Sequence, residues 1–143
     1  IIVSCNSLAH LTTAEALTSC LVCVRRHLAD GGMFAFDIVN PDLTLLQRPT
    51  RERSKRAERG SGVRLRETSR YDAQTRVREA HWRVHDQDGS VREVVFRLRQ
   101  FLPVGIPSLL DAAGLRLTAR YGDFDRRPFG ARSRSQICLA VAA

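Results

Sequence analysis

The first 42 residues contain two short apolar runs on either side of an amphipathic segment. The runs cover residues 1–5 and 33–39, and their β-branched and aromatic residues predict strands buried on both faces of a sheet. Between them, a stripe at three- and four-residue spacing predicts a helix: Leu17, Leu21, Val24 and Leu28. Thr12 or Thr13 is suited to cap its start, and Gly31-Gly32 to end it. The pattern predicts a right-handed unit of strand, helix and parallel strand.

From residue 63 the pattern changes to alternating apolar and polar positions. It predicts three strands between 63 and 101, with turns at 71–74 and 86–89, and the second turn carries the Asp-Gly hairpin signal. These strands would form an inserted three-stranded antiparallel meander, suited to a lid or a dimer surface. The basic segment 48–62 before them has no periodicity and is predicted to be a surface loop.

The last third of the chain returns to helix and strand patterns. A helix with Pro107 in its first turn closes at Gly114, and strands over 115–121 and 136–141 would form an antiparallel hairpin at the edge of the parallel sheet. The fold class is therefore predicted to be α/β. Residues 1–143 are interpreted as the C-terminal part of one domain, because the chain opens inside a strand and has no initiator Met.

Composition adds charge and thiols to this picture. The chain of 143 residues has a net charge of +8, which favours either an anion-binding surface or a solvated surface rich in arginine. No apolar run is long enough to span a membrane, so no membrane partner is expected. The four cysteines lack metal-ligand spacing and are interpreted as free thiols, Cys5 and Cys138 in core strands and Cys20 and Cys23 on the apolar side of the helix. They favour a reducing, cytoplasmic location.

Missing motifs argue against hydrolases and kinases. The chain has no G-x-S-x-G, no P-loop, no H-E-x-x-H and no G-x-G-x-x-G. In open α/β sheets, ligands bind beyond the carboxyl ends of the strands, which here are the loops 6–11 and 37–42. The first loop reads N-S-L-A-H-L and the second reads D-I-V-N-P-D. We expect the function to reside in these two loops.

These motifs, in this order, resemble class I S-adenosylmethionine-dependent methyltransferases, in particular the glycine/sarcosine N-methyltransferase type and the aminosugar N-methyltransferases. The resemblance continues through Gly31-Gly32, the meander, the R-L-R before Phe101, the Leu-Leu-x-x-Ala-Gly helix and Gly122-Asp123-Phe124. It implies the second half of a Rossmann-like methyltransferase sheet, whose glycine-rich cofactor loop is missing from this chain. It also implies S-adenosylmethionine as cofactor and a small-molecule acceptor with a nitrogen or oxygen nucleophile.

The resemblance also implies roles for single residues. Asn6 would hold a polar group of the acceptor, and His10 would orient or deprotonate the attacking atom. The cofactor would contact four residues of the same loop: Asn6, Ser7, Leu8 and Leu11. The acceptor would contact six residues elsewhere: Asp37, Asn40, Tyr71, Arg99, Tyr121 and Phe124. Val39 stands where the glycine-type enzymes carry an arginine for the substrate carboxylate, which argues against glycine as the acceptor.

Structural interpretations stay open for these residues: a strand-end turn for Asn6, a backbone-bonded ring for His10, local turn chemistry for Asn40, and packing for Tyr71 and Tyr121. For the whole chain, one alternative is a non-catalytic methyltransferase remnant, or a scaffold that forms a homodimer through the meander. The other is a nucleic-acid methyltransferase, which charge alone suggests and which the absence of N-P-P-Y or D-P-P-Y disfavours. The isolated chain is expected to be inactive.

Overall fold

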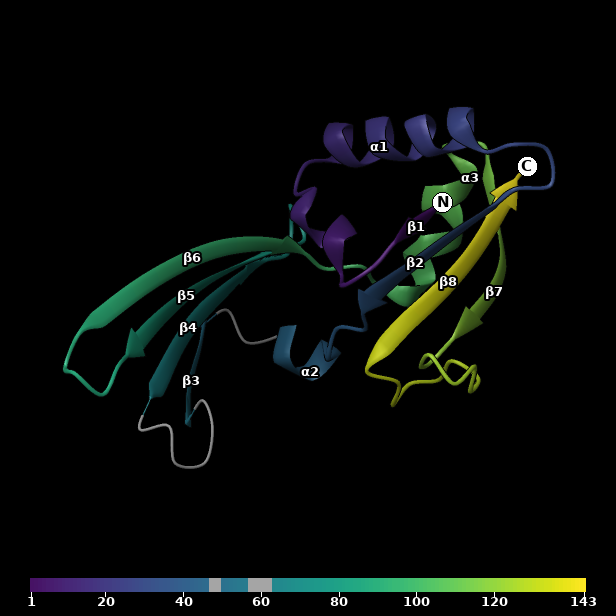
Figure 1. The fold of residues 1–143 in the computed structure, drawn as a ribbon. Helices are drawn as coiled ribbons and strands as arrows, with labels where there is room; N and C mark the ends of the chain where they lie inside the picture. The colour runs from purple at the N-terminus through teal and green to yellow at the C-terminus, as the bar shows by residue number, and fades with distance from the viewer. Residues whose placement is uncertain (47–49, 57–62) are drawn as a thin grey trace. The chain divides into compact units, whose positions relative to one another are not determined.

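The computed structural model describes residues 1–46, 50–56 and 63–143 (Figure 1). The chain divides into two compact units. The first comprises Ile1–Pro41 and Arg99–Ala143, and the second comprises Asp42–Leu98. Within the described residues, every helix is too short or too polar to cross a membrane.

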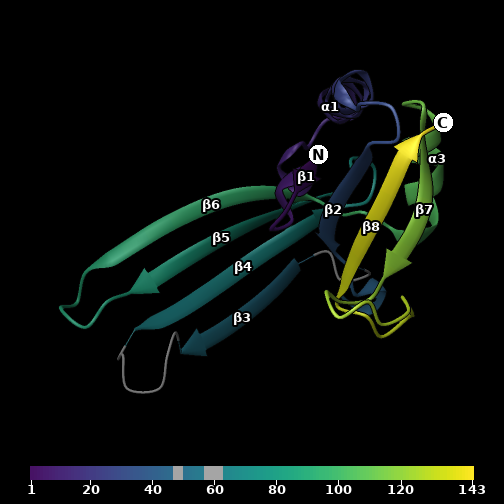
Figure 2. The ribbon, with the colours of Figure 1, turned by 45° about the vertical axis from the view of Figure 1, so that its right-hand side comes forward.

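The first unit is built on a four-stranded sheet. Its elements in chain order are β1 (Ile2–Val3), the 3-10 helix η1 (Ser7–His10), α1 (Ala14–His27), β2 (Met33–Val39), the 3-10 helix η2 (Pro103–Gly105), α3 (Ile106–Asp111), β7 (Leu115–Tyr121) and β8 (Ser135–Ala142). The strand order is β1-β2-β8-β7, with β1 parallel to β2 and β8 antiparallel to both of its neighbours (Figure 1, Figure 2). The predicted α/β class with a terminal antiparallel hairpin is confirmed, and β8 lies between β2 and β7.

Helix α1 forms where the apolar stripe predicts it. The Thr13 hydroxyl caps its start by accepting a hydrogen bond at 3.1 Å from the amide three residues further on. Three stripe residues are buried: Leu17, Leu21 and Val24. The helix ends at His27 because Leu28 is extended, so the prediction that Gly31-Gly32 ends it is wrong. Gly31 has a φ of 72° and forms the turn into β2 instead.

Strand β2 carries the centre of this unit's core. Phe34, Phe36 and Ile38 are at most 4% exposed, and the two phenyl rings stack with their centroids 4.9 Å apart. In the pairing of β2 with β8, Cys138 is the register partner of Phe36. Cys138 is fully buried, as predicted for a core thiol. Burying side chains of this size contributes about 1.5–3 kcal/mol each. The packed strands fix the positions at which the loops at their ends begin.

Strand β1 is shorter and more exposed than predicted. It spans only Ile2–Val3, and in the described chain it pairs only with β2. Ile1 and Ile2 are 45% and 79% exposed, so the prediction of burial on both faces is wrong for this run. The predicted burial of Cys5 and Cys23 is also wrong, because Cys5 lies in the turn after β1 and Cys23 on the outer side of α1.

Helix α3 agrees with its sequence signals. Pro107 lies in its first turn, and Gly114 closes the segment with a φ of 71°. A buried side chain of β8 holds the segment before this helix: the Gln136 side-chain nitrogen donates a hydrogen bond to the Phe101 carbonyl at 3.0 Å. This bond satisfies a buried carbonyl just before η2.

The second unit contains a four-stranded antiparallel sheet. Its elements are α2 (Leu43–Leu46), β3 (Thr50–Arg56), β4 (Arg64–Asp72), β5 (Val77–His85) and β6 (Val91–Arg99), and the strand order is β3-β4-β5-β6. The predicted meander is present as β4, β5 and β6. Strand β3 adds a fourth strand, so the predicted surface loop is wrong for 50–56, a stretch with no apolar residue to signal a strand. The rest of that predicted loop, 48–49 and 57–62, lies outside the described residues.

One face of this sheet carries a polar and aromatic cluster. Trp82 packs edge to face on Phe96, with the ring centroids 4.8 Å apart. The Trp82 indole N–H donates to one oxygen of Glu67 at 3.0 Å, and the Arg78 guanidinium pairs with the other oxygen. We call these four residues, Glu67, Arg78, Trp82 and Phe96, the aromatic cluster.

Candidate functional site

Three loops lie at the same edge of the first unit's sheet. β1 and β2 are parallel, so the loops 4–11 and 40–41 that follow them leave the sheet at its carboxyl edge. β7 is antiparallel to β8, which is antiparallel to β2, so the loop 122–134 leaves at that edge too. This edge is where ligands bind in open α/β sheets.

The loop after β1 begins with two residues in the left-handed region. Cys5 and Asn6 have φ angles of 61° and 59°. Such a backbone conformation costs a residue other than glycine about 1–3 kcal/mol. The Asp37 carboxylate offsets this cost, because one oxygen accepts from the Cys5 amide at 2.7 Å and the other from the Asn6 amide at 3.1 Å. Successive backbone N–H groups around an anion form a nest of this kind. Asp37 therefore fixes the direction in which the chain leaves β1.

Asn6 completes a two-way link between this loop and β2. Its side-chain oxygen accepts a hydrogen bond from the Val39 amide at 3.0 Å. Asp37 thus binds the loop, and the loop's Asn6 binds the end of β2. We call these three hydrogen bonds the Asp37–Asn6 clamp. In the described part of the chain, no hydrogen bond uses the side-chain nitrogen Nδ2 of Asn6, which leaves this donor for a ligand.

The 3-10 helix η1 carries the other predicted residues of the loop. Leu8 and Ala9 are 3% and 1% exposed, whereas Ser7 is exposed. The Ser7 hydroxyl donates to the Ser4 carbonyl at 2.5 Å. The predicted cofactor contacts of Asn6, Ser7, Leu8 and Leu11 stay predictions.

His10 ends η1 with an exposed imidazole. Over residues 1–46, 50–56 and 63–143, no hydrogen bond or ion pair to this ring is found, which gives the backbone-bonded alternative no support. An accessible imidazole is suited to proton transfer. The predicted catalytic role of His10 is therefore sterically open.

Arg99 holds the segment that follows His10. Its guanidinium donates to the Leu11 carbonyl at 3.2 Å and to the Thr12 carbonyl at 2.7 Å. These bonds fix residues 11–12, which directly precede Thr13, the N-cap of α1. Two donors of Arg99 are thus engaged with backbone, and its predicted contact with an acceptor stays a prediction.

Asn40 ties the loop 122–134 to the end of β2. Its amide donates to the Arg134 carbonyl at 2.9 Å, and its side-chain nitrogen donates to the Ser133 carbonyl at 2.8 Å. Its side-chain oxygen is buried, and no partner for that atom is found among the described residues. The structure uses Asn40 to position a loop, and its predicted acceptor contact stays a prediction.

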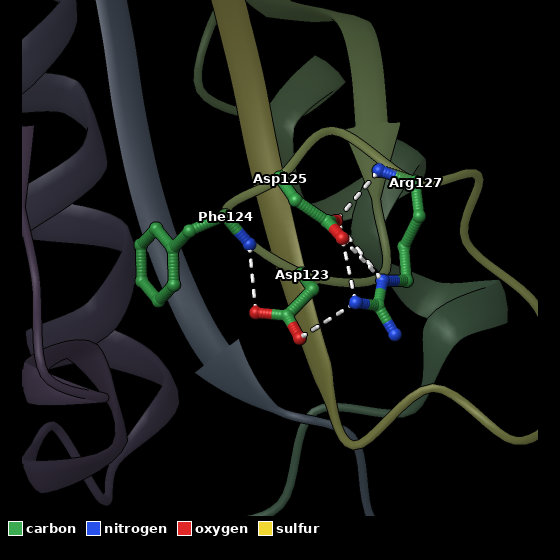
Figure 3. Close-up of polar contacts among 4 residues, drawn as sticks. All are labelled: Asp123, Phe124, Asp125 and Arg127. Atoms are coloured by element: carbon green, nitrogen blue, oxygen red, sulfur yellow. Dashed lines mark hydrogen bonds and ion pairs between the residues drawn. The ribbon is translucent and has the colours of Figure 1, made fainter.

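The loop 122–134 is also held by ion pairs of its own (Figure 3). The Arg127 guanidinium binds both oxygens of Asp125 at 2.6 to 3.0 Å and lies 3.9 Å from Asp123. Hydrogen bonds from the Arg127 side chain and amide lower the pKa of Asp125 to about 2. Asp123 accepts from the Phe124 amide at 2.8 Å. The Phe124 ring points away from these carboxylates in Figure 3 and is 72% exposed. The loop therefore presents an aromatic ring to solvent.

The two predicted tyrosines belong to different units. Tyr121 is half-buried at the end of β7, where its backbone bridges to Pro128. The next residue, Gly122, is buried, and a Cβ atom there would lie 2.3 Å from the Ser133 hydroxyl. Tyr71 is half-buried on β4 of the second unit. The acceptor contacts of both tyrosines stay predictions.

The sequence did not reveal that several of these side chains hold the loops in place by binding their backbone. Asp37, Asn40 and Arg99 all bind the backbone of a loop. Their partners lie 32, 93 and 87 residues away, so no local spacing reveals them. The D-x-x-N spacing marked two of the three positions without indicating what each side chain binds.

Known proteins show which class this fold is similar to. No family model and no curated protein match the chain. The structure of the CcbJ methyltransferase from Streptomyces caelestis is 28% identical, with a TM-score of 0.86 over 99% of this chain and 56% of that protein. An S-adenosylmethionine-dependent methyltransferase from Clostridium acetobutylicum is 14% identical, with a TM-score of 0.82 over 100% and 57%. CalS10, an amino pentose methyltransferase from Micromonospora echinaspora, is 23% identical, with a TM-score of 0.56 over 99% and 58%.

The chain therefore has the fold found in S-adenosylmethionine-dependent methyltransferases, and it spans little more than half the length of these relatives. The resemblance predicted from the two loop motifs and the meander is confirmed. The inserted sheet is part of the shared fold, since the matches cover nearly all of this chain.

Proposed function

We propose that this chain is part of an S-adenosylmethionine-dependent methyltransferase that acts on a nitrogen or oxygen nucleophile of a small molecule. One observation carries the proposal. On a fold with a TM-score of 0.86 to a methyltransferase, the Asp37–Asn6 clamp holds a loop that leaves His10 exposed just beyond the carboxyl edge.

A held loop suits the chemistry of methyl transfer. The cofactor's sulfonium supplies an activated methyl group, so alignment is the protein's main task. Fixing two reactants in line contributes up to about 7–11 kcal/mol in the best cases. The Asp37–Asn6 clamp restrains the start of the loop, and Arg99 restrains its end. This pair of restraints supports the predicted location of the reaction at the loop.

The proposal assigns two catalytic residues in this loop. His10 orients or deprotonates the nucleophile, and the Asn6 side-chain nitrogen donates to a polar group of the acceptor. The exposed Ser7 and the half-buried Leu11 fit the edge of a cofactor site, and the buried Leu8 packs beneath them. The chain has no G-x-G-x-x-G, so a second segment must hold the rest of S-adenosylmethionine.

The acceptor is proposed to contact the loop 122–134. Phe124 gives it an exposed aromatic face, and Tyr121 lies at the start of the same loop. Asp37, Asn40 and Arg99 then act as positioning residues through the loops that they hold. The relatives support a small acceptor, since one is named an amino pentose methyltransferase and another a sugar N-methyltransferase.

We also infer a cytoplasmic location from the four free cysteines. A homodimer formed through the meander is a further part of the proposal.

The direct test is His10→Ala in the full-length protein that contains this chain. We expect kcat to fall about 100- to 10,000-fold, the usual contribution of a general base, while the affinity for S-adenosylmethionine is kept. His85→Ala, which removes an exposed histidine of the second unit, is the matched control and should leave kcat unchanged. A His10→Ala enzyme with normal kcat would remove the catalytic role, and weakened cofactor binding alone would reassign His10 to the cofactor.

A second test uses the isolated chain of 143 residues. Without a glycine-rich loop, it is expected to show weak or no binding of S-adenosylhomocysteine in calorimetry and no turnover with any acceptor. Micromolar binding by the isolated chain would contradict the proposed division of the cofactor site. It would place most of the binding energy in the loop 4–11.

A further inference from the structure

Arg120, near the end of β7, contacts three other parts of the first unit. Its guanidinium donates a hydrogen bond to the Pro103 carbonyl at 2.7 Å, where η2 begins. The same nitrogen lies 3.5 Å from the side-chain oxygen of Gln136 on β8. The Cζ atom of Arg120 also lies 4.5 Å from the centroid of the Phe129 ring. One side chain therefore joins β8, the start of η2 and the loop 122–134.

The Arg120 guanidinium is held without a carboxylate. Within the described ranges, its hydrogen-bond partners are two oxygens of neutral groups, and its flat side lies over an aromatic ring. The face of a phenyl ring attracts a guanidinium, and the attraction grows as water is removed. Arg120 and Phe129 are both half-buried. The contact therefore restrains the ring and, with it, the loop.

The loop 122–134 is tied to the sheet at separate points. Its internal ion pair fixes its shape but does not attach it to a strand. Asn40 attaches the end of the loop to β2. In its middle, the backbone of Pro128 bridges to β7, and Arg120 adds a side-chain contact at the next residue, Phe129. Arg120 thus fixes the part of the loop that is remote from the Asn40 contact.

The segment 99–103 connects Arg120 to the loop that carries His10. The first residue of the segment donates hydrogen bonds to the carbonyls of residues 11–12. Its last residue accepts from Arg120, and its middle carbonyl accepts from the buried Gln136 at 3.0 Å. Both ends of the segment are therefore bonded to neighbouring structure. A continuous set of contacts runs from the His10 loop to the loop 122–134.

We propose that Arg120 is a positioning residue, which sets the loop 122–134 relative to the His10 loop and so aligns the acceptor. The inference rests on the proposed function, in which the loop 122–134 contacts the acceptor and His10 acts on its nucleophile. A misplacement of about 1 Å can cost about 100-fold in rate, even when its cause lies away from the reacting atoms. Arg120 acts through Phe129 and Pro103, not through a contact of its own with the acceptor.

The test uses the full-length protein that contains this chain. The acceptor probe is the molecule that this protein methylates best in a panel of small amines and alcohols. Arg120→Met keeps an unbranched side chain but removes the guanidinium, and kcat/KM for the acceptor should fall about 10- to 100-fold. The KM for S-adenosylmethionine should stay unchanged. A merely structural role predicts no such split between the two substrates.

Two further variants separate the contacts of Arg120. Phe129→Leu removes only the ring face and should lower kcat/KM for the acceptor about 2- to 5-fold. Because the two side chains act together, the double variant should be no worse than Arg120→Met alone. Arg120→Lys restores a positive charge over the ring and should recover part of the loss. These milder changes keep the test decisive if Arg120→Met does not fold.

Thr118→Val is the matched control. It removes another β7 side-chain hydrogen bond, from the Thr118 hydroxyl to the Leu139 carbonyl, and leaves the contacts of the loop intact. Hydrogen exchange of peptides covering 122–134 should be faster in Arg120→Met and unchanged in Thr118→Val. The proposal is overturned if an active enzyme keeps its acceptor kcat/KM in the Arg120 and Phe129 variants, or if both substrates are affected equally. Failure of the proposed function looks different, because the unsubstituted protein then transfers no methyl group.

Discussion

The β1-β2-β8-β7 sheet and the β3-β4-β5-β6 sheet differ in what their side chains contact. In the first sheet, alternate residues of β2 and β8 are buried, among them Phe34, Ile38 and Cys138. In the second sheet, only Ser69 and Ala80 are buried among the described side chains. Ion pairs such as Arg78–Glu67, Arg83–Glu93 and Arg97–Glu79 join its neighbouring strands instead.

This difference matches what each sheet supports. The first sheet must hold two consecutive left-handed residues, Cys5 and Asn6, in a fixed loop. A buried aromatic side chain contributes about 1.5–3 kcal/mol, whereas an exposed ion pair contributes about 0–1 kcal/mol. The apolar sheet can therefore bear the strain of a preorganised site. The charged sheet lacks such a core, and its described side chains are mostly polar and exposed.

Phe34→Ala is the most severe test of the comparison. It removes a ring that is 0% exposed, and we expect the free energy of unfolding of the first unit to fall by about 3–5 kcal/mol. Circular dichroism of α1 follows that unit, while fluorescence of Trp82, the single tryptophan, follows the second. Val95→Ala, at a residue that is 55% exposed, is the control and should stay within about 0.5 kcal/mol. Equal losses from the two substitutions would contradict the comparison.

The alkaline stability of the first sheet gives the next largest effect. Burial raises the pKa of the Cys138 thiol from 9.0 to about 12. Because the folded-state pKa is the higher one, its stabilising contribution is complete below pH 9 and is lost as the pH rises from 9 toward 12. The loss is at most about 1.4 kcal/mol per pH unit.

Urea denaturation on either side of pH 9 measures this dependence. Cys138→Ala should flatten the alkaline decline, because the buried titrating group is gone. Cys23→Ala removes an exposed thiol from the same unit and should keep the decline. If the parent chain and Cys138→Ala declined equally, Cys138 would not be responsible.

The apolar sheet was predictable from sequence because burial leaves a period in the residues. The stripe of α1 and the run of β2 are periodic for that reason, and both formed where predicted. Strand β3 reads T-R-E-R-S-K-R and has no apolar position, so nothing in its pattern distinguishes it from a loop. Its strand identity comes from backbone pairing with β4, which leaves no trace in side-chain type.

For the candidate site, sequence located the edge but not the roles. The carboxyl ends of the two parallel strands were enough to predict loops at 6–11 and 37–42, although residues 37–39 belong to β2. The roles depend on contacts such as Asn40 to Ser133, which join positions 93 residues apart. The left-handed turn at Cys5 had no signal either, because cysteine has no preference for that conformation. Contacts at long range and strained backbone are the parts that only a folded chain reveals.

Glu67→Gln tests the ionic half of the comparison. It keeps an oxygen for the Trp82 indole but removes the charge that pairs with Arg78. The Glu67 side chain is 14% exposed, so we expect a loss of about 1 kcal/mol in the second unit. Glu93→Gln is the matched control, since its pair with Arg83 is 55% and 62% exposed and should contribute only a few tenths of a kcal/mol. Trp82 fluorescence in urea measures both, and a larger loss for Glu93→Gln would show that burial does not set the strength of these pairs.

The smallest expected effect concerns the exposed ion pair in the loop 122–134. This loop belongs to the first unit, but like the strands of the second unit it is held by ion pairs. Arg127 lowers the pKa of Asp125 from 3.8 to about 2. Since the folded-state pKa is the lower one, the pair's contribution is present above pH 3.8 and is lost as the pH falls through about 2. Side-chain carboxyl carbon shifts measured across this range should report the lowered pKa directly. Arg127→Gln should return the pKa of Asp125 toward 3.8 and loosen the Phe124 amide, while the global stability above pH 3.8 stays nearly unchanged because the pair is solvated. An Asp125 that titrates near 3.8 with Arg127 in place would mean that the loop is not held as Figure 3 shows, and the rigid presentation of Phe124 would lose its basis.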